Sequence, residues 1–287
     1  MPNKKHALLL FAKAPLPGVV KTRLTEARGG IFSPEEAADF FKHCLLDVAE
    51  IGFSALSELA DLSRVEAEAG GGAADSYDLF LSTSPADNLP HLEKVFEEAG
   101  PWPAPIRFMI DSGKTFDEHF DDAFSQLFAA GYSSVVAIGG DVPALPPSHI
   151  VSAFRWLDYF ASYSDIGGFV QAPCQECGVS LVGYTDKTPM DSPGVYYNLQ
   201  GMAALDAYIA KAAERKVPVA CLSPVADIDD TGDLAHAASL VRALGYAGAY
   251  QPGLHVPRYT LSWLDSKGIV ISTPPNSEHD PREMLDK

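Results

Sequence analysis

Residues 11–24, FAKAPLPGVVKTRL, restrict the folds open to this chain more than any other stretch does. They follow a short apolar run, residues 7–11, that is typical of a buried β-strand. Pro15 and Pro17 stiffen the segment after this run because each ring fixes φ and removes an N–H group. Gly18 permits a turn that a Cβ atom would obstruct. The sequence therefore predicts a strand that runs directly into a rigid loop.

This loop carries three cations, Lys13, Lys21 and Arg23, in a chain with 21 Lys and Arg against 38 Asp and Glu. Open α/β sheets bind ligands at the loops that follow their strands. The point charge of Lys and the planar fork of Arg both suit phosphate oxygens. We therefore interpret Lys13, Gly18, Lys21 and Arg23 as a loop that binds a nucleotide diphosphate. A solvated basic loop is the alternative.

Residues 11–18, followed by KTRL at 21–24, closely resemble the opening motif of a family of bacterial glycosyltransferases in the nucleotide-diphospho-sugar transferase superfamily. The same loop is similar to the Lys-Thr-Arg segment of small nucleotidylyltransferases, including the 2-phospho-lactate guanylyltransferases. The resemblance implies an α/β, GT-A-like fold, which is a three-layer sandwich with a mostly parallel central sheet. It implies a nucleotide-sugar-binding domain over residues 1–245 and leaves residues 246–287 as a C-terminal extension.

Strands and helices alternate in the predicted order, which is typical of a doubly wound sheet. Apolar runs bounded by turn residues predict strands at 7–11, 77–83, 106–110, 134–138, 166–170, 179–184 and 217–222. Helices are expected at 33–48, 89–99, 116–130, 146–157, 202–215 and 234–244. Between residues 54 and 77 we expect a short helix and then a flexible loop. Phenylalanines at every fourth position from Phe116 to Phe128 predict a helix face in the core.

Asp141 follows the predicted strand at 134–138, behind Gly139 and Gly140. The glycines allow a ligand to approach closely, and a carboxylate there can hold Mg²⁺ or Mn²⁺ against a diphosphate. Relatives in the resembled family usually have Gly-Ser-Asp-Cys-Pro here, which this chain matches at Gly139, Asp141 and Pro143. The resemblance implies that Asp141 is the single essential acid of the GT-A Asp-x-Asp motif. A cap on the following helix is the alternative.

Asp227, Asp229 and Asp230 form a second acidic cluster. Like charges repel, and a bound cation would relieve that cost. Residues 228–231 loosely match an Asp-Val-Asp-Thr-Pro segment of the family. We therefore predict a metal site composed of Asp141 with Asp229 or Asp230. The alternative is a set of capping residues before the last predicted helix.

Cys174 and Cys177 have the spacing of half a zinc site, but no second Cys or His pair accompanies them in the sequence. We interpret them as incidental thiols. The resembled family has an acidic residue on the acceptor side just before a strand, and Glu176 falls roughly at that point. The resemblance therefore implies that Glu176 is a catalytic base for the acceptor.

The formal net charge of −17 argues against general nucleic-acid binding, because the phosphate backbone would be repelled. No apolar run approaches the roughly 20 residues that a membrane span requires, and we find no secretory signal. Four cysteines fit the reducing cytoplasm. The resemblance implies a metal-dependent transferase that uses a nucleoside-diphosphate sugar. A nucleotidylyltransferase that uses a nucleoside triphosphate and a non-catalytic nucleotide-binding protein are the alternatives.

Overall fold

The computed structural model describes residues 3–196 and 198–271. Its central sheet has seven strands in the order β3-β2-β1-β4-β6-β5-β7. Strand β6 runs antiparallel to both of its neighbours, and the other strand pairs are parallel, so the sheet is mostly parallel as predicted. The strands are β1 (Lys5–Phe11), β2 (Ser76–Thr83), β3 (Ile106–Ile110), β4 (Ser134–Gly139), β5 (Phe169–Pro173), β6 (Val179–Thr185) and β7 (Val219–Cys221).

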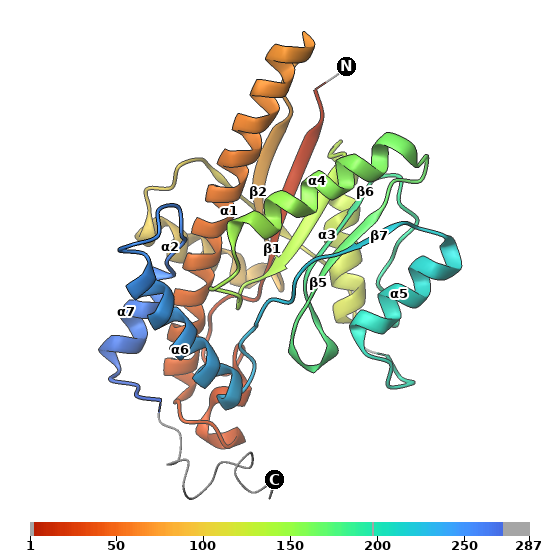
Figure 1. The fold of residues 1–287 in the computed structure, drawn as a ribbon. Helices are drawn as coiled ribbons and strands as arrows, with labels where there is room; N and C mark the ends of the chain where they lie inside the picture. The colour runs from red at the N-terminus through yellow and green to blue at the C-terminus, as the bar shows by residue number, and fades with distance from the viewer. Residues whose placement is uncertain (1–2, 197, 272–287) are drawn as a thin grey trace, which may run out of the picture.

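Helices cover both faces of the sheet and complete a three-layer sandwich (Figure 1). One face packs against α1 (Pro34–Gly70), α2 (Leu89–Ala99) and α4 (Pro147–Tyr163). The other face packs against α3 (Phe116–Ala129) and α5 (Ala204–Arg215). Two further helices, α6 (Thr231–Ala247) and α7 (Arg258–Ser266), pack against the first half of α1. The predicted fold class is therefore confirmed.

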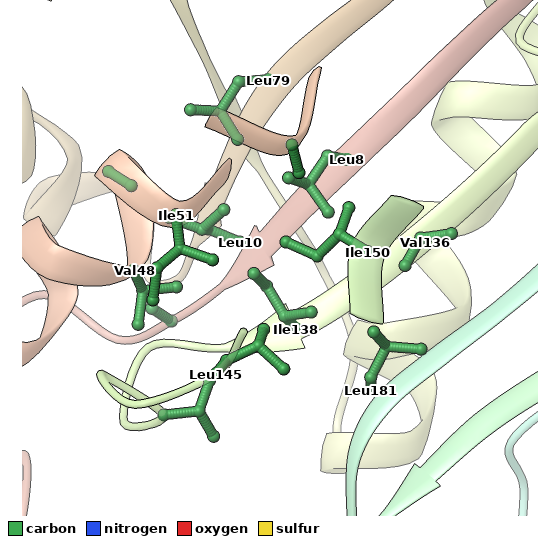
Figure 2. Close-up of a cluster of buried hydrophobic side chains, with 14 of the residues drawn as sticks. Leu8, Leu10, Val48, Ile51, Leu79, Val136, Ile138, Leu145, Ile150 and Leu181 are labelled. Carbon is green, nitrogen blue, oxygen red and sulfur yellow. The ribbon is translucent and has the colours of Figure 1, made fainter. Parts of the chain in front are cut away.

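Strand β1 divides the core because successive side chains of a strand point to opposite faces. Leu8 and Leu10 belong to the cluster shared with α1 and α4, whereas Ala7 and Leu9 pack on the α3 side. All four side chains are fully buried, as expected for a central parallel strand. Figure 2 shows the first cluster, which includes Leu8 and Leu10 of β1 and Ile150 of α4.

Helix α1 is continuous over 37 residues, so the predicted separation of a helix at 33–48 from a short helix that begins at residue 54 is wrong. Its start follows the expected chemistry, because Ser33 and Glu36 form a capping box. The Ala- and Glu-rich part of the sequence after residue 54 has high helix propensity and extends the helix. Gly52 does not interrupt it. A Cβ atom at Gly52 would lie 3.0 Å from Leu8 Cδ2, so the glycine lets α1 approach the sheet closely.

Most other predicted elements are found within a few residues of the expected bounds, but the strand predicted at 166–170 is displaced to Phe169–Pro173. Gly167 adopts a left-handed φ of 66°, which belongs to a turn. A Cβ atom at Gly168 would lie 2.2 Å from Phe160 Cδ2, so the chain enters β5 by passing closely over α4. The phenylalanine stripe of α3 is confirmed as core.

The C-terminal helices join the main fold through Trp263 of α7, which is buried. Its ring centroid lies 5.2 Å from that of Phe32 and 5.0 Å from that of Phe40, so α7 packs against α1 and the segment before it. The boundary predicted between residues 245 and 246 falls in the last turn of α6, and the division into domain and extension stays a prediction. Residues 272–287 lie outside the described part of the chain.

Asp47 of α1 fastens the start of α7. Its carboxylate is fully buried and accepts hydrogen bonds from the backbone N–H groups of Tyr259, at 3.0 Å, and Thr260, at 2.7 Å. Burial raises the pKa of Asp47 to about 7, although these hydrogen bonds favour the ionised form. The folded protein therefore holds a proton on this carboxyl group more tightly than an unfolded chain does.

We expect Asp47→Asn to flatten the pH dependence of stability, measured in EDTA to remove bound cations. Because the folded-state pKa lies above the ordinary value, stability supplied by the protonated Asp47 is complete below about pH 4 and is lost as the pH rises through about 7. The loss reaches at most about 1.4 kcal/mol per pH unit. Urea titrations from about pH 5 to pH 8 measure it. Asp61→Asn, an exposed change on the same helix, should keep the wild-type slope. An unchanged slope in Asp47→Asn would contradict the prediction.

Candidate functional site

The two strongest sequence motifs leave the sheet from adjacent strand ends. Phe11, the last residue of β1, is paired with Gly139, the last residue of β4. The chain continues from β1 to β2 on one side, while β4 lies on the other, so this edge is a topological switch point. Open α/β sheets bind ligands at such points, beyond the carboxyl ends of their strands.

An open cleft of about 620 Å³ lies at this edge. Its lining includes Lys13, Lys21 and Arg23 from the basic loop, Asp141 from the turn after β4, and Asp229 from the segment before α6. Five of the residues predicted from sequence therefore come together, although they are far apart in the chain. Their proximity is a property of the fold. The roles assigned to them stay predictions.

Lys21 is the central group of the cleft. Its Nζ atom lies 2.5 Å from Asp141 Oδ2 and 3.0 Å from Asp229 Oδ1, and only 7% of its side chain is exposed. Burial alone would lower the pKa of Lys21, but the two carboxylates reverse that effect and raise the pKa well above its ordinary value. Lys21 is therefore a permanent ammonium ion held between two carboxylates.

The other two cations are more accessible. Arg23 Nη1 lies 3.3 Å from Asp229 Oδ2, with 62% of the Arg23 side chain exposed. Lys13 is exposed on the wall of the cleft. Exposed ion pairs contribute little to stability, so an anionic ligand can replace Asp229 as the partner of Arg23 at a small cost in free energy. Both side chains can thus reach a ligand that enters from solvent.

Glycines shape the basic loop. Gly18 has a φ of 73°, which confirms the turn predicted there, but it is not among the residues that line the cleft. The backbone C=O of Leu24 accepts hydrogen bonds from the N–H groups of Ile31 and Phe32, both at 3.0 Å, and so closes the end of the loop. A Cβ atom at Gly30 would lie 2.0 Å from Leu24 O, so only glycine fits against this carbonyl group.

We expect Gly30→Ala to destabilise the protein by about 1–3 kcal/mol, because the backbone of Leu24 must move to admit the new methyl group. The shift would also displace Lys21 and Arg23 and weaken any ligand affinity that depends on them. Chemical denaturation measures the first effect. Gly72→Ala is the matched control, since a Cβ atom there meets nothing within 4 Å, and it should change stability by less than about 0.5 kcal/mol. Equal stabilities for the two variants would refute the steric argument.

Two glycines also form the floor beside Asp141. A Cβ atom at Gly139 would lie 2.6 Å from Asp141 Oδ1, and one at Gly140 would lie 2.9 Å from Leu45 Cδ1. The first clash would disturb the carboxylate and the second would push the turn away from α1. The pair therefore holds Asp141 close against the end of the sheet.

Two other predicted site residues are not among those that line the cleft. Asp230 is the N-cap of α6, where its carboxylate accepts hydrogen bonds from the N–H groups of Gly232 and Asp233. Asp230 therefore caps the helix, which is the alternative role that the sequence analysis gave for the acidic cluster. Glu176 is exposed and has a left-handed φ of 54°. The metal role of Asp230 and the catalytic role of Glu176 stay predictions.

Asp227 lines the cleft, although no role beyond membership of the acidic cluster was predicted for it. Burial raises its pKa to about 6, with a further rise from the nearby charges of Asp141 and Asp229, while the Cys174 thiol and Lys21 oppose the rise. A carboxyl group that titrates near neutrality in a cleft is a candidate for proton transfer. Three acids in four residues were a usable signal, but spacing alone did not distinguish which of them faces the cleft.

Gln175 holds Asp227 in place. Its side-chain amide donates to the C=O of Asp227 at 3.2 Å and accepts from the N–H of Asp227 at 3.1 Å. The same amide group donates to Asp233 at 3.1 Å. The turn between β5 and β6 is thereby tied to the segment before α6.

Aromatic and aliphatic side chains form another part of the lining. Phe11, Phe116, Val179 and Tyr196 contribute to it, and the ring centroids of Phe116 and Tyr196 are 4.7 Å apart. Buried Asp117 of α3 accepts a hydrogen bond from the Tyr196 N–H at 3.0 Å and so fixes the backbone of this residue. The cleft thus has a charged part and an apolar part.

The donor set of the charged part fits a hard divalent cation. Asp141 and Asp229 offer carboxylate oxygens, which are the ligands that Mg²⁺ prefers and Mn²⁺ accepts. One ammonium nitrogen lies within hydrogen-bond distance of both, so a single cation can contact the two residues together. A search of residues 3–196 and 198–271 finds one group of three possible metal ligands whose ligand atoms all lie within 4.8 Å of one another. The group consists of Asp47, Glu50 and His255, and it lies outside this cleft.

Comparisons with known proteins agree with this architecture. A family model described as "Uncharacterized protein conserved in bacteria (DUF2064)" matches residues 72–217, half of the chain. The crystal structure of a "putative nucleotide-diphospho-sugar transferase" from Desulfovibrio desulfuricans G20 has a TM-score of 0.64 and 23% identity, over 92% of this chain and 98% of that chain. This likeness confirms the fold class. A 4-diphosphocytidyl-2C-methyl-D-erythritol synthase from Anaerococcus prevotii DSM 20548 has a TM-score of 0.48 and 12% identity, over 84% and 96% of the two chains.

No curated protein matches the sequence significantly. In the described part of the chain, no helix combines the length and the apolar character needed to cross a membrane.

Proposed function

The chain belongs to the DUF2064 family of proteins conserved in bacteria, and from the geometry of its cleft we propose that it is a metal-dependent transferase of a nucleoside-diphosphate sugar. One observation carries the proposal. Lys21 lies between Asp141 and Asp229 in a cleft at the switch point of the sheet, with Lys13 and Arg23 on the same wall. The description of the Desulfovibrio protein, which has the same fold, is in keeping with it.

In this proposal the basic loop binds the diphosphate. Arg23 and Lys13 are exposed and meet the phosphate oxygens first, since neither is held by a buried carboxylate. Lys21 then exchanges part of its contact with Asp141 and Asp229 for a phosphate oxygen, which adds positive charge where the leaving nucleotide becomes negative. Asp141 and Asp229 would hold Mg²⁺ or Mn²⁺, and the bound ion would supply further positive charge for the same leaving group.

The rest of the cleft suits a sugar and its acceptor. The rings of Phe11, Phe116 and Tyr196 offer apolar surface for a sugar ring. Asp227 lines the same cleft, and Gln175 holds its backbone. We propose that Asp227 accepts the proton of the acceptor. Glu176 was the sequence-based candidate for that role, but it is exposed and lies outside the cleft lining.

A direct assay tests the proposal. Purified protein with Mn²⁺ should hydrolyse or transfer from one member of a panel of nucleoside-diphosphate sugars, and the matching nucleoside diphosphate should raise its melting temperature only when the metal is present. Asp227→Asn should lower turnover strongly, whereas Glu176→Gln should leave it near the wild-type value.

Exchange of labelled pyrophosphate into a nucleoside triphosphate would instead identify a nucleotidylyltransferase. Binding without any turnover would identify a nucleotide-binding protein and refute the transferase.

A further inference from the structure

A second cluster of possible metal ligands lies away from the cleft, where α1 meets the segment before α7. Asp47 and Glu50 are three residues apart on α1, so they share one helix face. His255 comes from the segment that connects α6 to α7. One ligand atom from each of the three lies within 4.8 Å of the other two. A small adjustment of the side chains would bring all three onto one ion.

The three side chains differ in how far they are already satisfied. Asp47 accepts two backbone hydrogen bonds from α7, and each of its oxygens keeps a lone pair. Glu50 Oε1 pairs with Arg258, which leaves its second oxygen for another partner. His255 Nε2 is buried and has no hydrogen-bond partner within the described residues. A buried polar atom without a partner is costly, and coordination of an ion would remove that cost.

The donor set indicates which ion. Two carboxylates and one imidazole are typical of zinc and similar transition metals, whereas Mg²⁺ and Ca²⁺ prefer oxygen ligands alone. The neutral imidazole of histidine is the form that binds metal. A metal ligand must be deprotonated, so an ion that binds here would displace the proton of Asp47. The two carboxylates would then outweigh the single positive charge of Arg258.

The cluster also has a route to solvent. A cavity of about 390 Å³ beside it is lined by Glu50 and Arg258 together with Phe53, Trp102 and Tyr259. An ion can reach Glu50 through this cavity, and a water molecule from the cavity can supply a fourth ligand. Ligand identity, spacing and access are the features that a metal site needs.

We propose that Asp47, Glu50 and His255 bind one transition metal ion of the zinc class, which fastens the segment before α7 to α1. This site is independent of the transferase proposal and of any ion held by Asp141 and Asp229. Its role is structural, because Asp47 already anchors α7 and the ion would add the connecting segment to the same anchor.

Metal titrations of the full chain, stripped with EDTA, test the proposal. Zn²⁺ should bind with a stoichiometry of one in calorimetry and raise the melting temperature, and Co²⁺ should give the visible absorption of a low-coordinate site. His255→Ala should weaken Zn²⁺ binding at least about 100-fold and abolish the Co²⁺ spectrum. His236→Ala, which removes an exposed histidine on α6, should bind Zn²⁺ like the wild type. Asp141→Asn should also retain the site, which separates it from the cleft.

Two outcomes would overturn the proposal. One is a wild-type dissociation constant for Zn²⁺ above about 1 mM. The other is Zn²⁺ binding that persists in His255→Ala but disappears in Asp141→Asn. If His255→Ala does not fold, Glu50→Gln provides the alternative test, because it removes the charge of one ligand and keeps the volume of the side chain. Undiminished Zn²⁺ affinity in Glu50→Gln would then refute the site.

Discussion

Asp141→Asn is expected to reduce transferase turnover about a thousandfold. The carboxylate of Asp141 is one of the two that contact Lys21, and it holds the divalent cation in the proposed mechanism. An amide of the same size keeps the shape of the turn but loses the charge that both partners need. Steady-state kinetics with the best nucleotide sugar, at saturating Mn²⁺, measures the change.

Two variants separate catalysis from folding in this experiment. The amide leaves buried Lys21 with Asp229 as its remaining carboxylate partner in the described cleft, so Asp141→Asn also loses stability. Combining it with Lys21→Met removes the unbalanced charge and should restore stability without restoring turnover. Asp230→Asn is the control, because Asp230 caps α6 and Asn caps helices about as well, so stability and turnover should both stay near the wild-type values. Wild-type turnover in Asp141→Asn would refute the proposed role.

Lys21→Met should destabilise the protein by about 3 kcal/mol and at the same time tighten Mn²⁺ binding. Methionine has a similar length but no charge, so Asp141 and Asp229 would face each other without the ammonium ion that now joins them. A divalent cation can replace that ion, and excess Mn²⁺ should therefore recover much of the lost stability. Affinity for a nucleoside diphosphate should fall, since a phosphate-binding charge is gone.

Denaturation with and without Mn²⁺, together with calorimetry, measures these effects. Arg23→Met is the matched control, because Arg23 also contacts Asp229 but is largely exposed. We expect it to change stability by less than about 1 kcal/mol while it weakens nucleotide binding. The interpretation of Lys21 as the internal counter-ion fails if Lys21→Met is as stable as the wild type and binds Mn²⁺ no more tightly.

The sheet was predictable because most of its strands are buried on both faces and read as apolar runs. The end of β1 and the turn at Gly139 indicated the position of the cleft as well, since both follow such runs. The sequence prediction divided α1 into two helices, whereas in the fold Gly52 lies within one continuous helix and permits contact with Leu8. The conformation at Gly52 follows from the packing of α1 on the sheet, which the helix propensity of single residues does not reveal.

The site was predictable to the extent that charge was concentrated in the sequence. Lys21 and Asp141 stood out, and they meet in the cleft. The sequence assigned the metal role to Asp229 or Asp230 and no role to Asp227, because the choice between lining a cleft and capping a helix depends on contacts from the turn at Gln175. The cluster of Asp47, Glu50 and His255 had no sequence signal, since more than two hundred residues separate His255 from the two acids.

The bond between Gln175 and the backbone of Asp227 has a consequence for how members of this family can diverge. An insertion in the β5–β6 turn would displace Asp227 as well. New acceptor specificities should therefore arise by exchange of side chains in the apolar part of the cleft and not by lengthening of that turn.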